Sequence, residues 1–177
     1  MLVPSVLRPS ARWATPALVA YRSLSTTATR QAPLTIKKEL YTAKATATGA
    51  GRNGTVKSED NGEAPLSLKL STPKPMGGQG DGQNPEQLFA MGYASCFLGA
   101  LQLTAKNAGK ADIAANAKIH TSVSIGPPEQ PPLPGFGLRV TIEVEGVDDD
   151  KIIGDTHEFC PYSRLIKHGA QVTVKKI

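Results

Sequence analysis

Cysteine is scarce in this chain: Cys96 and Cys160 are the only two thiols among 177 residues. Cys96 lies within the apolar run Leu88–Leu98, whereas Cys160 ends a short helical pattern and precedes Pro161. Two such thiols have three interpretations, namely inert core residues, a static disulfide or a redox couple. Free cysteine is among the residue types most often buried, so inert core residues are the simplest of the three.

Histidine is also scarce, with three residues in the chain. His157 and Cys160 have the spacing H-x-x-C, and Cys96 could supply a third zinc ligand. A structural zinc site needs four ligands in compact pairs, and the only other histidines are His120 and His168. The sequence therefore predicts no metal site and no bound cofactor.

Residues 1–30 contain no acidic residue and no lysine, but they are rich in serine and threonine. They carry four arginines: Arg8, Arg12, Arg22 and Arg30. This composition is typical of an organelle transit peptide, with a disordered tail as the alternative. We expect a mitochondrial leader at 1–30 and a mature protein in the matrix, a reducing compartment that favours a cycling disulfide over a static one. No apolar run here approaches the ~18 residues of a membrane span, and we expect none.

Excess positive charge is lacking beyond this leader. Without its four arginines the chain carries 16 basic and 15 acidic residues. Nucleic-acid binding needs a basic face, so the near-neutral balance argues against that class. The glycine-rich segment 76–83 has no GK[ST] sequence, which argues against nucleotide binding.

Strand patterns fill the region before residue 71. Residues 37–48 and 55–58 predict two strands, and the alternating segment 66–70 predicts a third. The glycine-rich segment 49–54 predicts a turn, and Asp60-Asn61-Gly62 predicts a hairpin.

Residues 85–108 predict the longest helix. Asn84 is a suitable N-cap, Pro85 suits the first helical position and Gly109 ends the pattern. Apolar residues occur round most of the circumference, so we expect a central buried helix.

The remaining chain predicts strands at 117–125 and 136–144, a helix at 148–159 and a last strand at 171–175. The proline-rich loop 127–134 between the first two cannot be a central strand. One α+β domain over residues 36–177 follows from this order of elements.

Cys96 must be ionised to the thiolate to act as a nucleophile. Burial in an apolar helix raises a thiol pKa, so a nearby cation is required to favour the thiolate. Arg52 is the only arginine between residues 31 and 138, and Glu86 could orient it. A solvated turn arginine and a first-turn helix carboxylate are the simpler interpretations of these two residues.

Glu86 and Cys96 are ten residues apart on the same predicted helix. Ten residues of straight helix span about 15 Å, too far for one site. Cooperation requires either a bend in the helix or a Glu86 contributed by a second subunit.

Two segments carry a family resemblance. The segment 80–101, with the sequence GDGQNPEQLFAMGYASCFLGAL, closely resembles the central motif of the organic hydroperoxide resistance (Ohr) branch of the OsmC/Ohr superfamily. The segment 157–163, HEFCPYS, resembles the second cysteine motif of that branch. Segments 40–43 and 70–73 are also similar to family segments, and the resemblance covers residues 36–177.

The resemblance implies an OsmC/Ohr-like fold, with antiparallel sheets around a long central helix in an intertwined homodimer. It implies that Cys96 is the peroxidatic cysteine and Cys160 the resolving one, and that Arg52 and Glu86 form the activating pair at the subunit interface. The implied substrates are organic hydroperoxides, including those of fatty acids. The implied reductants are dihydrolipoyl groups of lipoylated proteins, which suits a matrix location.

Two other functions remain open. An OsmC-type peroxidase would have a broader substrate range, and a non-catalytic redox sensor would use its disulfide to switch a partner. The two cysteine motifs favour the Ohr branch. The sequence shows no additional interaction domain, which counts against a sensor.

Overall fold

The computed structural model describes residues 33–59, 64–129 and 134–177. The expected leader, the hairpin signal at 60–62 and the centre of the proline-rich loop lie outside the described residues.

The first sheet is antiparallel in the order β1-β2-β3, with β1 at Ala45–Thr48, β2 at Thr55–Ser58 and β3 at Ser67–Lys69. The predicted strand at 55–58 is confirmed, whereas that at 37–48 is wrong except for its last four residues. Residues 37–43 pair with no strand among the described residues, and Leu40 is 90% exposed. Alternation alone does not specify a strand, because pairing also needs a second strand from elsewhere in the sequence.

The turn between β1 and β2 contains the short 3₁₀ helix η1, Gly51–Asn53. Gly49 and Gly51 have φ values of 84° and 59°, which other residues rarely adopt. These glycines let the chain reverse tightly and place Arg52 at its tip. A second 3₁₀ helix, η2 at Lys74–Met76, leads toward the long helix.

The long helix α1 spans Pro85–Asn107 and confirms the prediction. Asn84 and Gln87 form a reciprocal capping box, which satisfies two backbone N–H groups at the helix start. Tyr93, Phe97 and Leu101 are buried at four-residue spacing on one face.

The expectation of a central buried helix holds for one side of α1 in the single chain. Met91 is 65% exposed and Leu103 is 43% exposed. Among the described residues, β4, η3, α2 and α3 pack against α1, and side chains of β5 join its buried cluster. By length and hydropathy α1 also meets the criterion of a membrane span, as core helices of soluble proteins do.

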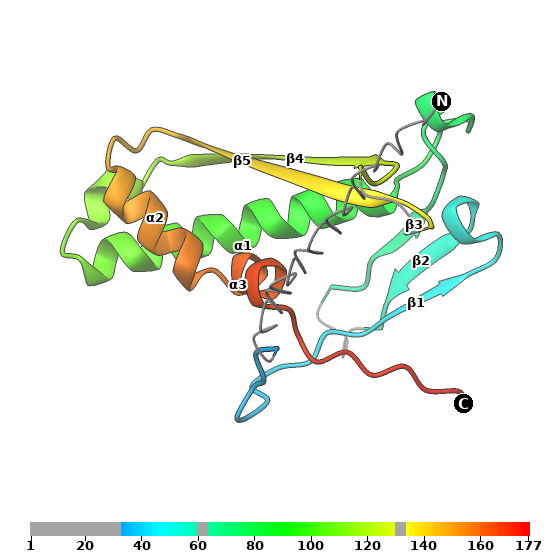
Figure 1. Ribbon diagram of the computed structural model, residues 1–177, viewed down its shortest axis with the longest axis horizontal. Coiled ribbons are helices and arrows are strands. Elements are labelled where there is room, and N and C mark those ends of the chain that lie inside the picture. Colours follow the sequence, from blue (N-terminus) through cyan, green and yellow to red (C-terminus); the bar gives the residue numbers. More distant parts are fainter. Residues whose placement is uncertain (1–32, 60–63, 130–133) are drawn as a thin grey trace, which may run out of the picture. The chain divides into compact units, whose positions relative to one another are not determined.

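The second sheet is an antiparallel pair, β4 at Lys118–Gly126 and β5 at Gly137–Glu145. It confirms both predicted strands within one residue at each end. The 3₁₀ helix η3 at Ala111–Ala114 joins α1 to β4. Figure 1 shows α1 running alongside these two strands.

Two helices follow β5: α2 at Asp150–Phe159, capped by Asp149, and α3 at Pro161–His168. The sequence analysis missed α3, because Pro161 reads as the end of a helix but here occupies the first position of a new one. The predicted strand at 171–175 is wrong: those residues have no regular structure and Val174 is 92% exposed. The α+β class, with antiparallel sheets and one long helix, is confirmed.

Candidate functional site

The structure brings the two cysteines together. Cys96 lies on α1, and Cys160 is the residue between α2 and α3. Their Sγ atoms are 3.7 Å apart and unbonded, against about 2.05 Å in a disulfide. Cys160 is fully buried and Cys96 is partly buried. The pair is therefore a reduced dithiol whose sulfur atoms need only a small movement to bond.

The pKa of Cys96 is raised above that of an ordinary thiol. Burial is the main cause, and the neighbouring Cys160 adds to it. The backbone amide of Tyr162 acts in the opposite direction and lowers the pKa of Cys96. Neither Cys160 nor the Tyr162 amide supplies the cation that the sequence analysis expected beside Cys96.

Three aromatic rings belong to the same packed cluster as the two cysteines. The rings of Phe89 and Tyr162 stack with their centroids 6.1 Å apart, and the ring centroids of Tyr93 and Tyr162 are 5.6 Å apart. The Tyr93 hydroxyl shares a buried hydrogen bond of 2.8 Å with Ser163 Oγ. Sequence reasoning missed this group, although the three- and four-residue spacing of Phe89, Tyr93 and Cys96 places them on one face of α1.

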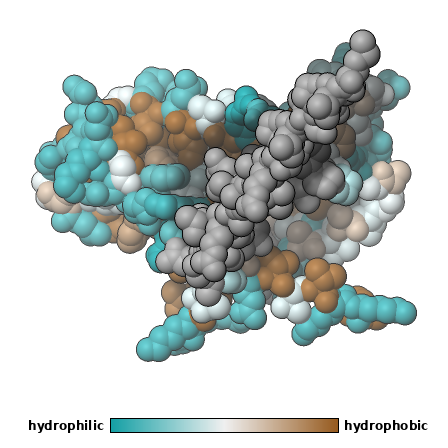
Figure 2. All heavy atoms as spheres, viewed as in Figure 1, coloured by the Kyte–Doolittle hydropathy of each residue, from teal (hydrophilic) through white to brown (hydrophobic). Residues whose placement is uncertain are grey.

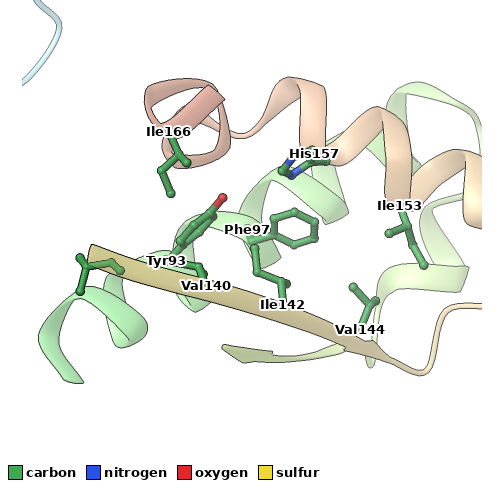
Figure 3. A pocket seen from close by; sticks show the side chains of 9 residues that line it. Tyr93, Phe97, Val140, Ile142, Val144, Ile153, His157 and Ile166 are labelled. Carbon is green, nitrogen blue, oxygen red and sulfur yellow. The ribbon is translucent and has the colours of Figure 1, made fainter. Parts of the chain in front are cut away.

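An apolar cavity of about 420 Å³ lies beside the buried cluster that contains Cys160, although neither cysteine lines it. Tyr93 and Phe97 belong both to its lining and to the buried cluster that contains Cys160. Figure 3 shows these two side chains of α1 between the side chains of β5 and those of α2 and α3. Figure 2 shows apolar residues gathered along β5 beside α2. The complete lining is Tyr93, Phe97, Leu138, Val140, Ile142, Val144, Ile153, His157 and Ile166.

The structure also pairs Arg52 with Glu86. The guanidinium forks onto the carboxylate: Nη1 donates to Oε1 at 3.1 Å and Nη2 donates to Oε2. This hydrogen bond lowers the pKa of Glu86, so the carboxylate stays ionised at neutral pH. The Nε atom of Arg52 is buried, and among the described residues it has no hydrogen-bond acceptor. The Nε–H group of Arg52 is therefore available to donate to a further acceptor.

Within one chain, the Cys96–Cys160 pair and the Arg52–Glu86 pair lie at separate sites. Because α1 is one uninterrupted helix from residue 85 to 107, the bend that would bring Glu86 to Cys96 is absent. About 15 Å of helix separates the two residues. Arg52 is held by Glu86 at the start of α1 and therefore lies away from the dithiol.

The described residues contain no group of three His, Cys, Asp or Glu side chains placed to hold a metal ion. His157 lines the apolar cavity instead.

This fold and its dithiol define an α+β protein with one candidate redox centre. The family model described as OsmC-like protein matches residues 78–175. An organic hydroperoxide resistance protein of Xanthomonas axonopodis pv. citri is 44% identical over 145 residues, covering 78% of this chain and 95% of that protein. The chain belongs to the OsmC/Ohr family, which confirms the resemblance that the two cysteine motifs carry.

Solved structures agree with this membership. The organic hydroperoxide resistance protein OhrB of Bacillus subtilis superposes with a TM-score of 0.60 at 38% identity, over 76% of this chain and 97% of that one. An organic hydroperoxide resistance protein of Vibrio cholerae, with captopril bound in one of its active sites, gives a TM-score of 0.64 at 38% identity. That match covers 77% of this chain and 91% of the other.

Proposed function

We propose that the protein is a cysteine-based peroxidase that reduces organic hydroperoxides to alcohols. The observation that carries this proposal is the 3.7 Å approach of two unbonded thiols in a chain of the Ohr family. The apolar cavity beside the Cys160 cluster supports an organic substrate, because moving a hydrocarbon group out of water lowers its free energy.

The chemistry runs through both sulfur atoms. The Cys96 thiolate attacks one peroxide oxygen, the O–O bond breaks, and the alkoxide takes up a proton to leave as the alcohol. Cys96 is then a sulfenic acid, which Cys160 attacks to form a disulfide with release of water. A dithiol reductant exchanges with this disulfide, so that the reductant is oxidised and both thiols are regenerated.

We propose dihydrolipoyl groups of lipoylated proteins as that reductant, and the mitochondrial matrix as the location. A steady-state assay tests the proposal, comparing dihydrolipoamide with thioredoxin and using tert-butyl and fatty-acid hydroperoxides as substrates. Turnover with dihydrolipoamide supports it. One stoichiometric oxidation without turnover by either reductant would favour a redox sensor instead.

The composition of residues 1–30 supports import into mitochondria, since Arg-rich segments without acidic residues are typical of transit peptides. Fusing these residues to a fluorescent protein should direct it to mitochondria, as seen by microscopy. A variant with all four leader arginines changed to glutamine is the matched control and should stay in the cytosol. Cytosolic fluorescence from both fusions would reject the leader.

We propose a homodimer in which Arg52 and Glu86 of one subunit act on Cys96 of the other. The buried Nε–H of Arg52 has no acceptor among the described residues of its own chain, and a partner's thiolate would supply one. The exposed face of α1 supports this assembly. Gln87, Met91, Ser95 and Gly99 are exposed at four-residue spacing along one ridge.

The positions of Glu86 and Cys96 on α1 predict where the two-fold axis of the proposed dimer would lie. If two antiparallel copies of α1 bring Glu86 of one opposite Cys96 of the other, the midpoint between these residues lies on the axis. That midpoint is Met91, which is 65% exposed in the single chain. Met91→Cys should therefore cross-link the dimer under mild oxidation, because each residue would face its own copy.

The cross-link is measured by non-reducing electrophoresis in a Cys96→Ser, Cys160→Ser background, so that only the new thiol reacts. Lys106→Cys is the matched control, since this residue is also exposed on α1 but far from the midpoint. Equal cross-linking of both variants, or a monomer in sedimentation, would contradict the proposed axis.

Arg52→Ala should slow peroxide reduction at neutral pH. A guanidinium near the sulfur favours the thiolate, so its removal should raise the pKa of Cys96. The pH profile of the rate should therefore shift to higher pH. Single-turnover kinetics with excess peroxide measure this profile. Arg52→Lys should recover part of the rate, since lysine keeps the charge but loses the fork onto Glu86. Unchanged pH profiles in both variants would contradict an activating role.

Mixed dimers test whether Arg52 acts across the interface. A dimer of one Cys96→Ser chain and one Arg52→Ala chain would regain one complete site if Arg52 acts on the partner's Cys96. If Arg52 acts within its own chain, the mixed dimer has no complete site.

A further inference from the structure

Cys160 lies in a closed part of the core. It has no exposed surface, and it packs with side chains of α1 in one buried cluster. Its backbone is held on both sides: its N–H donates to the Thr156 carbonyl at 2.8 Å, and its carbonyl accepts from the Arg164 N–H at 3.0 Å. A second subunit can only add cover, so Cys160 stays buried in the proposed dimer as well.

Cys96 is the more accessible sulfur of the pair, because its side chain is only partly buried. A peroxide must also reach Cys96 in the proposed function, so the assembled protein must keep an opening there. The two Sγ atoms are 3.7 Å apart, and closing them to the roughly 2.05 Å of a disulfide needs only a small movement. Oxidation therefore leaves Cys160 inside the core and Cys96 at the opening.

We propose that the reductant attacks the sulfur of Cys96 in the disulfide, and that the buried Cys160 selects dithiols over monothiols as reductants. This inference rests on the proposed peroxidase function and specifies how its disulfide is reduced. The rate of thiol–disulfide exchange depends on which sulfur the incoming thiolate can reach. A sulfur without exposed surface is reached only when the core opens locally, which costs free energy.

The first exchange leaves the reductant on Cys96. Its thiolate bonds to Cys96 Sγ, the bond between the two cysteines breaks, and Cys160 leaves with the electron pair and takes up a proton. The product is a mixed disulfide on Cys96 with the Cys160 thiol packed beside it. Leaving-group strength opposes this direction, since a Cys96 thiolate stabilised by Arg52 would be the better leaving group. Access decides, because Cys160 has no exposed surface.

The fate of the mixed disulfide depends on the reductant. Cys160 can lose its proton, bond again to Cys96 Sγ and expel a monothiol as its thiolate, so that nothing has been reduced. Well-oriented intramolecular groups reach effective concentrations of about 10⁵ M or more, which a second monothiol from solution cannot match. A dithiol carries its own second thiolate, which attacks the reductant sulfur and releases Cys96 as the thiolate. The dithiol leaves as a cyclic disulfide, and both cysteines are reduced.

Ellman's reagent tests both parts of the proposal without peroxide. Each attack on this aromatic disulfide releases one coloured thiolate, which is measured by absorbance. Reduced wild-type protein should release about two equivalents, because Cys160 expels the second half of the reagent from Cys96. The second release should not depend on reagent concentration. Cys160→Ser should release one equivalent and retain the other half on Cys96, as found by mass spectrometry.

Cys96→Ser is the matched variant, because it keeps only the buried thiol. While folded, as judged by circular dichroism, it should react at least about a hundredfold more slowly than Cys160→Ser, since Cys160 must wait for local opening. In guanidinium it should react fully. A folded Cys96→Ser protein that reacts as fast as Cys160→Ser would overturn attack at Cys96. Wild-type protein that retains half of the reagent would overturn the selection by Cys160.

The attacked sulfur can also be mapped in the wild type, which decides the matter if Cys96→Ser does not fold. Oxidised protein is treated with excess cysteamine, a monothiol, then quenched in acid with N-ethylmaleimide and digested. Mass spectrometry should find cysteamine on Cys96 and maleimide on Cys160. The reverse placement would overturn the proposal.

Turnover with peroxide separates this inference from the proposed function. Cysteamine should support turnover at least about tenfold faster in Cys160→Ser than in the wild type, because Cys160 no longer displaces it. Equal rates in a wild type that cycles with dihydrolipoamide would overturn the selection and leave the peroxidase function standing. The expected exchange with Ellman's reagent in protein without any peroxide turnover would refute the peroxidase function and leave the exchange chemistry standing.

Discussion

Cys96→Ser should abolish peroxide reduction. The serine hydroxyl is almost wholly un-ionised at neutral pH, and it is a far weaker nucleophile toward peroxide oxygen than a thiolate. Turnover with dihydrolipoamide should fall to the rate measured without protein. Cys96 is only partly buried, and serine is close in size, so the fold should survive the change.

The control for this variant is its structure. Circular dichroism and the oligomeric state should match those of the wild type, which shows that lost activity reflects the missing sulfur. Substantial residual turnover in a folded Cys96→Ser protein would remove Cys96 from the mechanism.

Cys160→Ser should stop the reaction after its first half. Without a resolving thiol, each chain should consume about one equivalent of peroxide and then remain as the sulfenic acid or oxidise further. Mass spectrometry after a peroxide pulse should find the added oxygen on Cys96. The 3.7 Å separation of the two sulfur atoms is the reason for expecting Cys160 to resolve that species directly.

Turnover of this variant should be compared between a small monothiol and dihydrolipoamide as reductants. A small monothiol in excess could attack the sulfenic acid in place of Cys160 and restore slow turnover. Normal cycling with dihydrolipoamide and no oxidised Cys96 would show that Cys160 is not the resolving residue.

The local elements of the fold were predictable from sequence because their signals are local. Asn84 and Gln87 form their capping box within one helical turn, and β4 and β5 carry matching alternation on both strands. The failures depend on distant or absent partners. Residues 37–43 and 171–175 have strand-like alternation, but they pair with no strand among the described residues.

The candidate site was predictable at its cysteines and less so around them. Two motifs single out Cys96 and Cys160, yet spacing could not show that Arg52 would fork onto Glu86. The packing of Tyr162 on Phe89 and Tyr93 was beyond reach because Tyr162 belongs to α3, a helix that the sequence did not predict. Pro161 was read as the end of one helix, whereas it begins the next.

The uncovered face of α1 bears on how the protein should be handled in solution. If a second copy covers Met91 and the residues along its ridge, folding and assembly form one equilibrium, and the apparent stability rises with protein concentration. Dilution would then expose Met91 and its ridge on α1 to water, and the dilute chain would be the form prone to aggregation. A thermal midpoint that climbs steadily with concentration is the signature of that coupling.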